Sequence, residues 1–264
     1  MATARYINDN RSMVAYLRAD FSPQAFINAA QILLSFGLNA LSPTNPYRTS
    51  TNQAGQATFG GGEVIDAISH AAGLALKACW YQKWAVHRRV RPEAFAGSLH
   101  NMKKYGATYN VPIHTDLLNS SVLNAVQAAT GTWLLPMAYP EGSPNHPAFP
   151  AGHAAFAGAG ATILKAFFDE KFAIPSPMVA SADGTSLVGY VGAPLTVGNE
   201  VNKLASNISV PRDAAGVHWR TDAVEGMALG EAVAIALLQD MTQCYNERFT
   251  GFSFTKFDGT PIAI

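Results

Sequence analysis

Apolar residues recur at three- and four-residue intervals along most of this chain, which is the spacing of one face of an α-helix. The pattern breaks where prolines and glycines gather. Pro92 should end one long helix, because the residue before a proline avoids helical backbone. The predicted helices are residues 23–38, 63–90, 116–129, 153–172 and 215–247, with a shorter one over 199–205.

The two ends of the chain follow a different pattern. Residues 1–22 are polar and predict an arm or a short helix, and residues 252–264 predict a tail with a short extended pair. Since no repeat or linker divides the chain, residues 1–264 are expected to form one all-α bundle with long loops around its mouth. The predicted loops are residues 42–62, 94–114, 131–152 and 173–213.

Composition limits the kinds of binding partner but does not decide the oligomeric state. Charged residues make up only 14% of the chain and hydrophobic residues 48%, whereas a typical domain has about 25% charged residues. Two explanations fit equally: a subunit interface that covers apolar surface, or one large and well-covered core. The net charge of zero argues against nucleic acid or an anionic membrane as the main partner.

Hydropathy and cysteine content bear on the compartment. The apolar stretches 25–41 and 227–238 are too short or too polar to span a membrane, and residues 1–5 lack the apolar centre of a signal peptide. A soluble protein is therefore expected, with the cytoplasm favoured. Cys79 and Cys244 lie too far apart for a close metal-binding pair, and they allow one disulfide or none.

The turn before the predicted helix over 153–172 is a candidate site. Two prolines and a glycine in 147–152 turn the backbone, and an alanine-rich run then starts the helix at His153. A helix start gathers unpaired N–H groups and the positive end of the dipole, so it holds oxyanions readily. Gly158 and Gly160 are expected to let a neighbour pack closely. This turn is predicted to be one wall of an anion pocket.

A second segment carries basic groups that suit an anion. Four of the 18 Lys and Arg residues lie within nine positions. Lys83 and Arg91 are eight residues apart, about two helical turns, so both are expected on one helix face. Arg88 and Arg89 are predicted to form a solvated basic face instead.

The third segment runs from Arg212 to Asp222. His218 and Asp222 stand four residues apart, so the carboxylate can hold the imidazole in one tautomer and leave the other nitrogen as a nucleophile or ligand. An ordinary ion pair of Asp222 with Arg220 or with another helix is an equal alternative.

In order along the chain, these segments read Lys-x7-Arg-Pro, Pro-x-Gly-His and Arg-x5-His-x3-Asp. In this combination the chain resembles the vanadium-dependent haloperoxidases, which share a superfamily with type 2 phosphatidic acid phosphatases and bacterial class A acid phosphatases. The sequence segments KWAVHRRVRPE, EGSPNHP and GVHWRTD resemble those of the bromoperoxidase branch. The resemblance runs from Gln82 to the end of the chain.

The resemblance implies a role for each residue of the pocket. Vanadate would be bound covalently by the outer imidazole nitrogen of His218, with Asp222 behind it, and His153 would move protons. His146 matches an extra histidine of the bromoperoxidases and would tune protonation or halide preference. Ala151 stands where most relatives have a serine. The remaining contacts to the vanadate oxygens would come from Lys83, Arg91, Arg212 and the N–H of Gly152.

The same resemblance implies a helical-bundle enzyme that oxidises bromide, and iodide, with hydrogen peroxide to a hypohalous acid, which halogenates a small organic acceptor. Phosphate can occupy the same site, so the alternative is a phosphomonoesterase that forms a phosphohistidine at His218, with His153 as the acid. A non-catalytic anion-binding scaffold is a third hypothesis, suggested by Ala151 and the low charge. Relatives are oligomeric, which implies a homo-oligomer, a dimer or larger.

Overall fold

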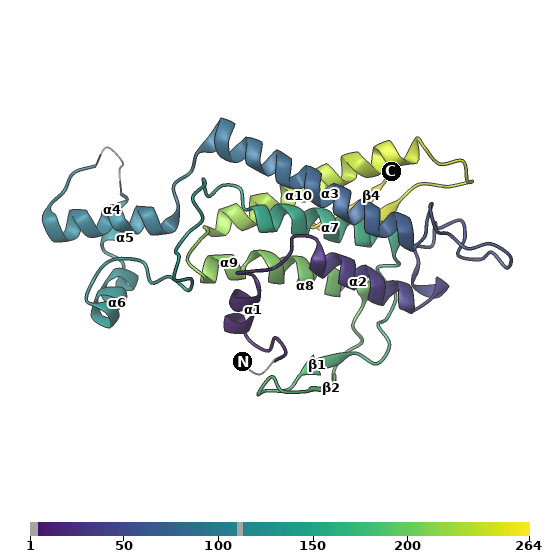
Figure 1. Cartoon of the computed structure of the whole chain (residues 1–264), viewed down its shortest axis with the longest axis horizontal. Helices are drawn as coiled ribbons and strands as arrows, with labels where there is room; N and C mark the ends of the chain where they lie inside the picture. Colours follow the sequence, from purple (N-terminus) through teal and green to yellow (C-terminus); the bar gives the residue numbers. More distant parts are fainter. Residues whose placement is uncertain (1–4, 110–112) are drawn as a thin grey trace.

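Helix α7 (Gly152–Phe167) is the centre of the fold, and all its residues from 154 to 167 are buried. The computed structural model describes residues 5–109 and 113–264 (Figure 1). Four helices of this part of the chain pack around α7 and form the predicted all-α bundle. They are α2 (Gln24–Ser35), α3 (Gly61–Tyr81), α8 (Val197–Ser209) and α10 (Arg220–Thr242).

Small residues let α10 lie directly against α7. Any side chain at Gly158 would collide with the backbone of Met227 on α10, so the predicted close approach at Gly158 is confirmed. Gly160 makes room for an aromatic ring instead, because a Cβ there would lie 2.6 Å from Cγ of Phe26 on α2. The alanine and glycine content of α7 therefore explains how one helix can be buried on all sides.

The remaining elements are short or lie at the ends of the bundle. Strand β1 (Met178–Ala180) pairs antiparallel with β2 (Leu187–Gly189), and β3 (Ser253–Thr255) pairs with β4 (Pro261–Ala263). The second hairpin is the extended pair predicted for the tail. The other elements are α1 (Asn10–Tyr16), the 3-10 turn η1 (Leu38–Ala40), the π-helical η2 (Gln82–His87), α4 (Pro92–Tyr105), α5 (Thr115–Leu118), α6 (Ser121–Thr130) and α9 (Pro211–Ala214).

The structure differs from the prediction on both sides of Pro92. The helix before it does not reach residue 90, because η2 ends at His87 and Arg88 adopts a left-handed conformation with φ 47°. Residues 94–114, predicted to be irregular, contain most of α4. Pro92 begins that helix, as proline does in a first turn, and Gly106 ends it with φ 65°.

Other predicted helices exist but have different bounds. The segment 116–129 forms two helices, α5 and α6, that break at Asn119, and α8 extends its predicted range at both ends. Helix α7 ends at Phe167, where the chain becomes extended. Helix α10 begins only at Arg220, after a turn in which Gly216 has φ 83°.

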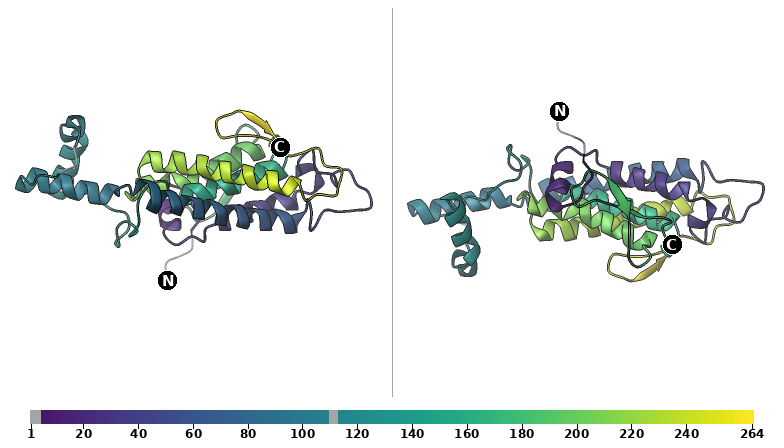
Figure 2. Two further views of the ribbon diagram at one scale, coloured as in Figure 1. Left: turned by 90° about the horizontal axis from the view of Figure 1, so that it is seen from above. Right: turned by 90° about the horizontal axis from the view of Figure 1, so that it is seen from below.

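The loops of the site meet at one end of the bundle. There α3 ends and α7 and α10 begin, and α4, α5 and α6 extend outward from the same end (Figures 1 and 2). The N-terminal segment also packs here rather than forming a free arm, since α1 contacts α9 and Leu17 is 1% exposed. Long loops at this mouth were predicted, as was helical structure in the segment of α5 and α6, whereas α4 and the outward projection of all three helices were not.

Neither cysteine forms a disulfide: Cys79 is buried and Cys244 is exposed. Among the residues that the structure describes, none of the helices has the length and apolar character that a membrane span requires. Residues 1–4 of the predicted N-terminal arm, which include most of the stretch 1–5 examined for a signal peptide, and residues 110–112 of the predicted loop over 94–114 lie outside the described residues.

Candidate active site

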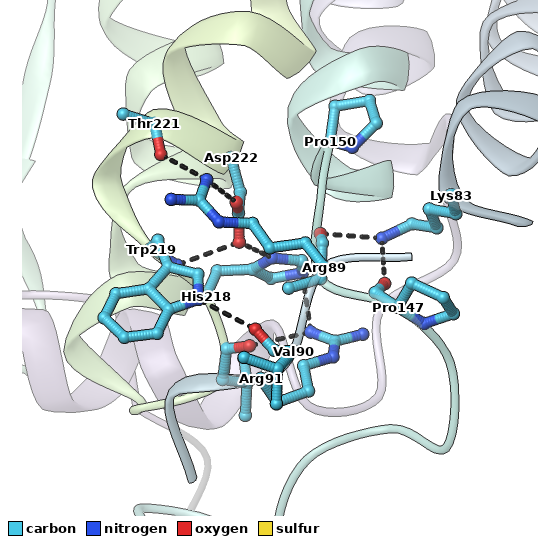
Figure 3. Close-up of polar contacts among 12 residues, drawn as sticks. Lys83, Arg89, Val90, Arg91, Pro147, Pro150, His218, Trp219, Thr221 and Asp222 are labelled. Atoms are coloured by element: carbon cyan, nitrogen blue, oxygen red, sulfur yellow. Dashed lines mark hydrogen bonds and ion pairs between the residues drawn. The ribbon is translucent and has the colours of Figure 1, made fainter. Parts of the chain in front are cut away.

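The backbone from His146 to Ala148 holds two of the predicted cations. The Lys83 ammonium donates to the carbonyls of Pro147 (2.7 Å) and Ala148 (2.8 Å), and Arg91 Nε donates to the carbonyl of His146 (2.9 Å). The exposed fractions of Lys83 and Arg91 are 0% and 6%. The basic segment and the turn before α7 are therefore in direct contact (Figure 3).

Lys83 and Arg91 do not share a helix face, although their spacing predicted it. Lys83 lies in η2, whereas Arg91 follows the left-handed turn at Arg88 and has extended backbone (φ −70°, ψ 150°). Arg91 therefore reaches the pocket from a loop. The expected proximity holds, but tertiary contacts produce it rather than helical periodicity.

His218 precedes α10, and its two ring nitrogens have different partners (Figure 3). Nδ1 lies 3.0 Å from Asp222 Oδ2, and Nε2 lies 3.1 Å from Arg91 Nη1. A guanidinium only donates, so Nε2 is the unprotonated nitrogen and Nδ1 donates to the carboxylate. Burial lowers the pKa of His218 to about 3, so the ring is neutral near pH 7. The imidazole thus presents an electron pair at Nε2, as a ligand or a nucleophile requires.

Asp222 is fully buried and accepts hydrogen bonds from three donors. Besides His218, the Trp219 N–H donates at 2.9 Å and Arg89 Nη1 donates at 3.0 Å. Asp222 therefore both holds the His218 imidazole and forms an ion pair, the two roles that the sequence left open. The cation of the ion pair is Arg89 and not Arg220.

Arg89 keeps part of the predicted solvent contact, with a side chain that is 38% exposed, but its guanidinium also packs against two aromatic rings. Its guanidinium carbon lies 5.5 Å from the centre of the Phe149 ring and 5.6 Å from that of Trp219, and its Nη1 also donates to Thr221 Oγ1 (2.6 Å). Arg88 does stay on the surface, where its Nε donates to the carbonyl of Trp84. Sequence alone missed the role of Arg89, because its partners come from distant segments.

Arg212 is the third predicted cation and projects from α9 with 7% exposure. Its Nη1 donates to the carbonyl of Leu17 (3.0 Å) and to the hydroxyl of Tyr139 (3.4 Å). Its Nε is buried and has no hydrogen-bond partner among the described residues. A buried donor without an acceptor is costly, and a bound oxyanion would supply that acceptor.

His153 lies in the first turn of α7, and its Nε2 is 2.8 Å from Oδ1 of Asp20. The Asp20 side chain is 5% exposed and belongs to the N-terminal segment that was predicted to be an arm or short helix. Sequence analysis missed Asp20, since no local spacing links two residues that are 133 positions apart. The contact leaves Nδ1 as the ring nitrogen of His153 that can face a ligand.

The start of α7 offers backbone donors. Ala151 is the N-cap, and no side chain caps the helix, so the N–H groups of the first turn, including that of Gly152, lack an intrahelical acceptor. The Ala151 N–H donates to the carbonyl of Asp222 (2.9 Å), which ties the start of α7 to the start of α10. All three predicted segments therefore meet at one place.

His146 lies at the edge of this pocket, where a cleft of about 610 Å³ opens; we call it the side cleft. His146 Nδ1 is 3.1 Å from Arg91 Nη2 and 3.2 Å from the carbonyl of Pro147. Burial and the nearby cations lower the pKa of His146 to about 4, so it is neutral near pH 7. The lining of the side cleft includes Trp84, Val90, Arg91, Glu93, Ser143 and His146.

The pocket carries an excess of buried positive charge. Burial lowers the pKa of Lys83 to about 8, and burial together with Arg212 lowers that of Arg91 to about 10, because charged groups lose water there. The negative charge of Asp222 is paired with Arg89, so it does not fully offset the positive charges of Lys83, Arg91 and Arg212. A multiply charged oxyanion fits this set of donors, since it would pair with the cations and with Arg212 Nε.

Comparison with known proteins assigns the chain to a family. A family model described as the VCPO second helical-bundle domain matches residues 64–247. The chain therefore belongs to the vanadium-dependent haloperoxidase family, and the resemblance seen in the sequence is confirmed, as is the all-α bundle.

Individual relatives lie in the bromoperoxidase branch. The chain is 38% identical over 284 residues to a vanadium-dependent bromoperoxidase of Corallina pilulifera, covering 99% of this chain and 47% of that protein. For a vanadium-dependent bromoperoxidase of Ascophyllum nodosum the identity is 34% over 271 residues, with 98% and 48% covered. The chain thus spans about half the length of these curated relatives.

A solved structure shares the arrangement closely. The homohexameric second vanadate-dependent bromoperoxidase (AnII) from Ascophyllum nodosum superposes with a TM-score of 0.87 at 32% identity, over 99% of this chain and 49% of that one. The fold described above, including the end of the bundle that carries the site, is therefore similar to half of a bromoperoxidase subunit.

Proposed function

We propose that this chain is a vanadate-dependent haloperoxidase that oxidises bromide, and iodide, with hydrogen peroxide to a hypohalous acid. One observation carries the proposal: buried Lys83, Arg91 and Arg212 are grouped with an unprotonated His218 Nε2 beside the start of α7. The family to which the chain belongs supports it.

The residues of the pocket fit vanadate. His218 Nε2 would be its covalent ligand, while the three cations and the N–H of Gly152 would bind its oxygens. When bound, vanadate supplies a pentavalent Lewis acid that activates hydrogen peroxide toward a halide. The protein contributes donors that are already in place, so little reorganisation is needed when charge develops.

His153 is the residue best placed to move protons. Forming hypobromous acid and water from bromide and peroxide consumes a proton, so the pocket needs a group that exchanges protons with solvent. Asp20 fixes Nε2 of His153, and the side chain of His153 is 24% exposed. An imidazole in the first turn of α7 that keeps contact with solvent meets this requirement.

Anion affinity is expected to fall as the pH rises through about 8, where Lys83 loses its proton. The protonated ammonium attracts an anion and the neutral amine does not, so each pH unit above that pKa should weaken binding up to about tenfold. Calorimetric titration with phosphate between pH 7.5 and 9.5 measures this. Lys83→Met should bind phosphate weakly at every pH, and its affinity should no longer fall between pH 7.5 and 9.5. If its affinity fell with pH as steeply as that of wild type, a group other than Lys83 would be responsible.

Ala151→Ser is expected to tighten vanadate binding. A serine hydroxyl would add one charge-assisted hydrogen bond of about 1.5–3 kcal/mol, which corresponds to roughly 10- to 150-fold in affinity. The same hydroxyl would cap α7, which has no side-chain cap. Vanadium NMR titration measures the affinity. Ala40→Ser, at a fully buried position of η1 that belongs to none of the three site segments, is the control, and equal affinity of wild type and Ala151→Ser would reject the prediction.

The activity itself is tested by bromination of a phenol dye with vanadate, peroxide and bromide, set against hydrolysis of a chromogenic phosphate. Bromination that requires added vanadate supports the proposal. Hydrolysis without bromination would favour a phosphomonoesterase, in which the neutral Nε2 of His218 attacks phosphorus. Binding of vanadate without either reaction would favour a non-catalytic scaffold.

The same proposal includes assembly into a homo-oligomer. The structural neighbour is a homohexamer, and this chain exposes large apolar side chains around the end of the bundle that carries the site. Light scattering measures the assembly, and a monomer at micromolar concentration would contradict it. Exposed apolar residues of α3, η2, α6 and α10 include Trp80, Tyr81, Val86, Val122 and Val224.

A further inference from the structure

One short segment near the start of the chain contacts two pocket residues that are far from it in the sequence. We call residues 9–20, which comprise α1 and the turn after it, the strap. The Leu17 carbonyl accepts from Arg212 Nη1 at 3.0 Å, and Asp20 Oδ1 lies 2.8 Å from His153 Nε2. Helix α1 also contacts α9, which carries Arg212 (Figure 1). The strap therefore contacts both the third cation of the pocket and the histidine in the first turn of α7.

Tyr139 joins the strap to Arg212. Its hydroxyl donates to the carbonyl of Val14 at 2.9 Å and accepts from Arg212 Nη1 at 3.4 Å. The guanidinium carbon of Arg212 lies 5.4 Å from the centre of the Tyr139 ring. Since Tyr139 is only 5% exposed, water cannot easily replace these contacts. Tyr139 and the Leu17 carbonyl thus fix one Nη group of Arg212, while its buried Nε has no partner among the described residues.

The strap is held to the bundle by few apolar contacts. Of residues 9–20, Val14 and Leu17 are the two that are buried. Leu17 belongs to the main core, whereas Val14 packs with Tyr139, Ala215 and Val217 in a small separate cluster. Helix α1 has seven residues, and isolated helices shorter than about 12–15 residues are marginal in water. A segment of this kind opens locally at a low free energy while the bundle stays folded.

Anion binding and docking of the strap favour the same arrangement of the pocket. An oxyanion supplies the acceptor that buried Arg212 Nε lacks. When the strap opens, Arg212 loses the Leu17 carbonyl and His153 loses Asp20, so both side chains become free to turn toward water. Two events that favour one arrangement are coupled by a single free energy, and each changes the equilibrium of the other by the same factor.

We propose that the strap and Tyr139 position Arg212 and His153, so that the pocket reaches its full affinity for an oxyanion only while the strap is docked. Tyr139 is a positioning residue, because it acts on the anion through Arg212. The occupied pocket keeps the strap closed, and the empty pocket lets it open more often. This inference rests on the anion pocket of the function proposed above, but it does not require oxidation of a halide.

Calorimetric titration with phosphate is the first test. Tyr139→Phe keeps the ring beside Arg212 but removes the hydroxyl that holds it to the strap. This change should weaken phosphate binding about 3- to 10-fold, the effect of one hydrogen bond. Leu17→Ala removes the anchor of the strap in the main core and should weaken binding by a similar factor.

Two matched controls separate positioning from a general loss of stability. Tyr245→Phe removes a hydroxyl that donates to Glu63 at the opposite end of the bundle, and Leu33→Ala truncates a leucine of α2 that is 4% exposed. Both should bind phosphate like wild type, although Leu33→Ala should unfold at a lower urea concentration. Equal phosphate affinity of wild type and Tyr139→Phe, or an equal loss in Leu17→Ala and Leu33→Ala, would overturn the proposal.

Amide hydrogen exchange is the second test, and it measures the coupling from the side of the strap. Saturating phosphate should slow exchange of the strap amides about 10-fold in wild type and by a smaller factor in Tyr139→Phe. The hairpin of β3 and β4 is the control, because it is another short element but lies at the other end of α7, where Lys165 donates to the carbonyl of Thr255. Its exchange should change much less.

The outcomes distinguish this inference from the proposed function. Equal slowing in the strap and in the hairpin of β3 and β4, or no binding of phosphate by wild type, would overturn the role of the strap. Coupled exchange and binding in a protein that does not brominate would defeat the haloperoxidase function alone, since neither test uses peroxide or halide.

Discussion

Replacing His218 by alanine is expected to abolish vanadate-dependent bromide oxidation while the fold survives. The imidazole supplies the unprotonated nitrogen that would be the covalent ligand, so vanadate affinity should fall about 100-fold or more, and activity about 1000-fold. The fold should tolerate the change at a cost of about 1–3 kcal/mol, because the groups around His218 keep other partners. Asp222 keeps Trp219 and Arg89, and Arg91 keeps the carbonyl of Val217 at 2.7 Å.

Vanadium NMR, a bromination assay and circular dichroism measure the three consequences of His218→Ala separately. His100→Ala is the matched control, since His100 is also a buried histidine, 7% exposed, but lies on the projecting α4. It should leave vanadate affinity unchanged. If His218→Ala bound vanadate as tightly as wild type, the assignment of the ligand atom would be wrong.

Asp222→Asn is expected to produce the largest loss of stability of any single change at the site. The carboxylate is fully buried and accepts from Arg89, His218 and the Trp219 N–H. An amide can accept from only part of this set and removes the charge that pairs with Arg89. Because the Arg89 side chain is 38% exposed and can turn to water, the cost comes mainly from the weakened hydrogen bonds to the buried carboxylate, about 2–4 kcal/mol of the free energy of unfolding.

The same change should weaken vanadate binding. Outer partners of a ligating histidine orient the ring and raise its basicity, and losing one costs about 10- to 100-fold in affinity. Removing a negative charge near an anion acts in the opposite direction, but Asp222 is already paired with Arg89, so we expect the loss to prevail. Urea unfolding and vanadium NMR provide the two measurements.

A double-mutant cycle tests whether Arg89 acts through Asp222. Arg89→Gln alone should cost less than Asp222→Asn, because Asp222 would keep His218 and Trp219. The coupling between the two changes is expected to be about 1–3 kcal/mol. Glu225→Gln, at an exposed position of α10, is the control and should change the free energy of unfolding by less than about 0.5 kcal/mol. Strict additivity would mean that the contact contributes little.

The sequence by itself determined the class of fold and most of the pocket. Helical periodicity placed the helices that surround α7, because that signal depends only on neighbours three and four residues away. The spacing of His218 and Asp222 predicted their contact for the same reason. The ordered combination of the three segments identified the family, and the family implies vanadate as the oxyanion.

Only the tertiary structure decided which distant groups complete the site. Asp20 reaches His153, and Arg89 reaches Asp222, through contacts that span 133 positions each and leave no local pattern. The way Lys83 and Arg91 meet was also beyond the sequence, since a left-handed residue at Arg88 replaced the expected helix turn. Periodicity reports the local backbone, whereas the charge, burial and partners of a side chain depend on segments that folding alone brings together.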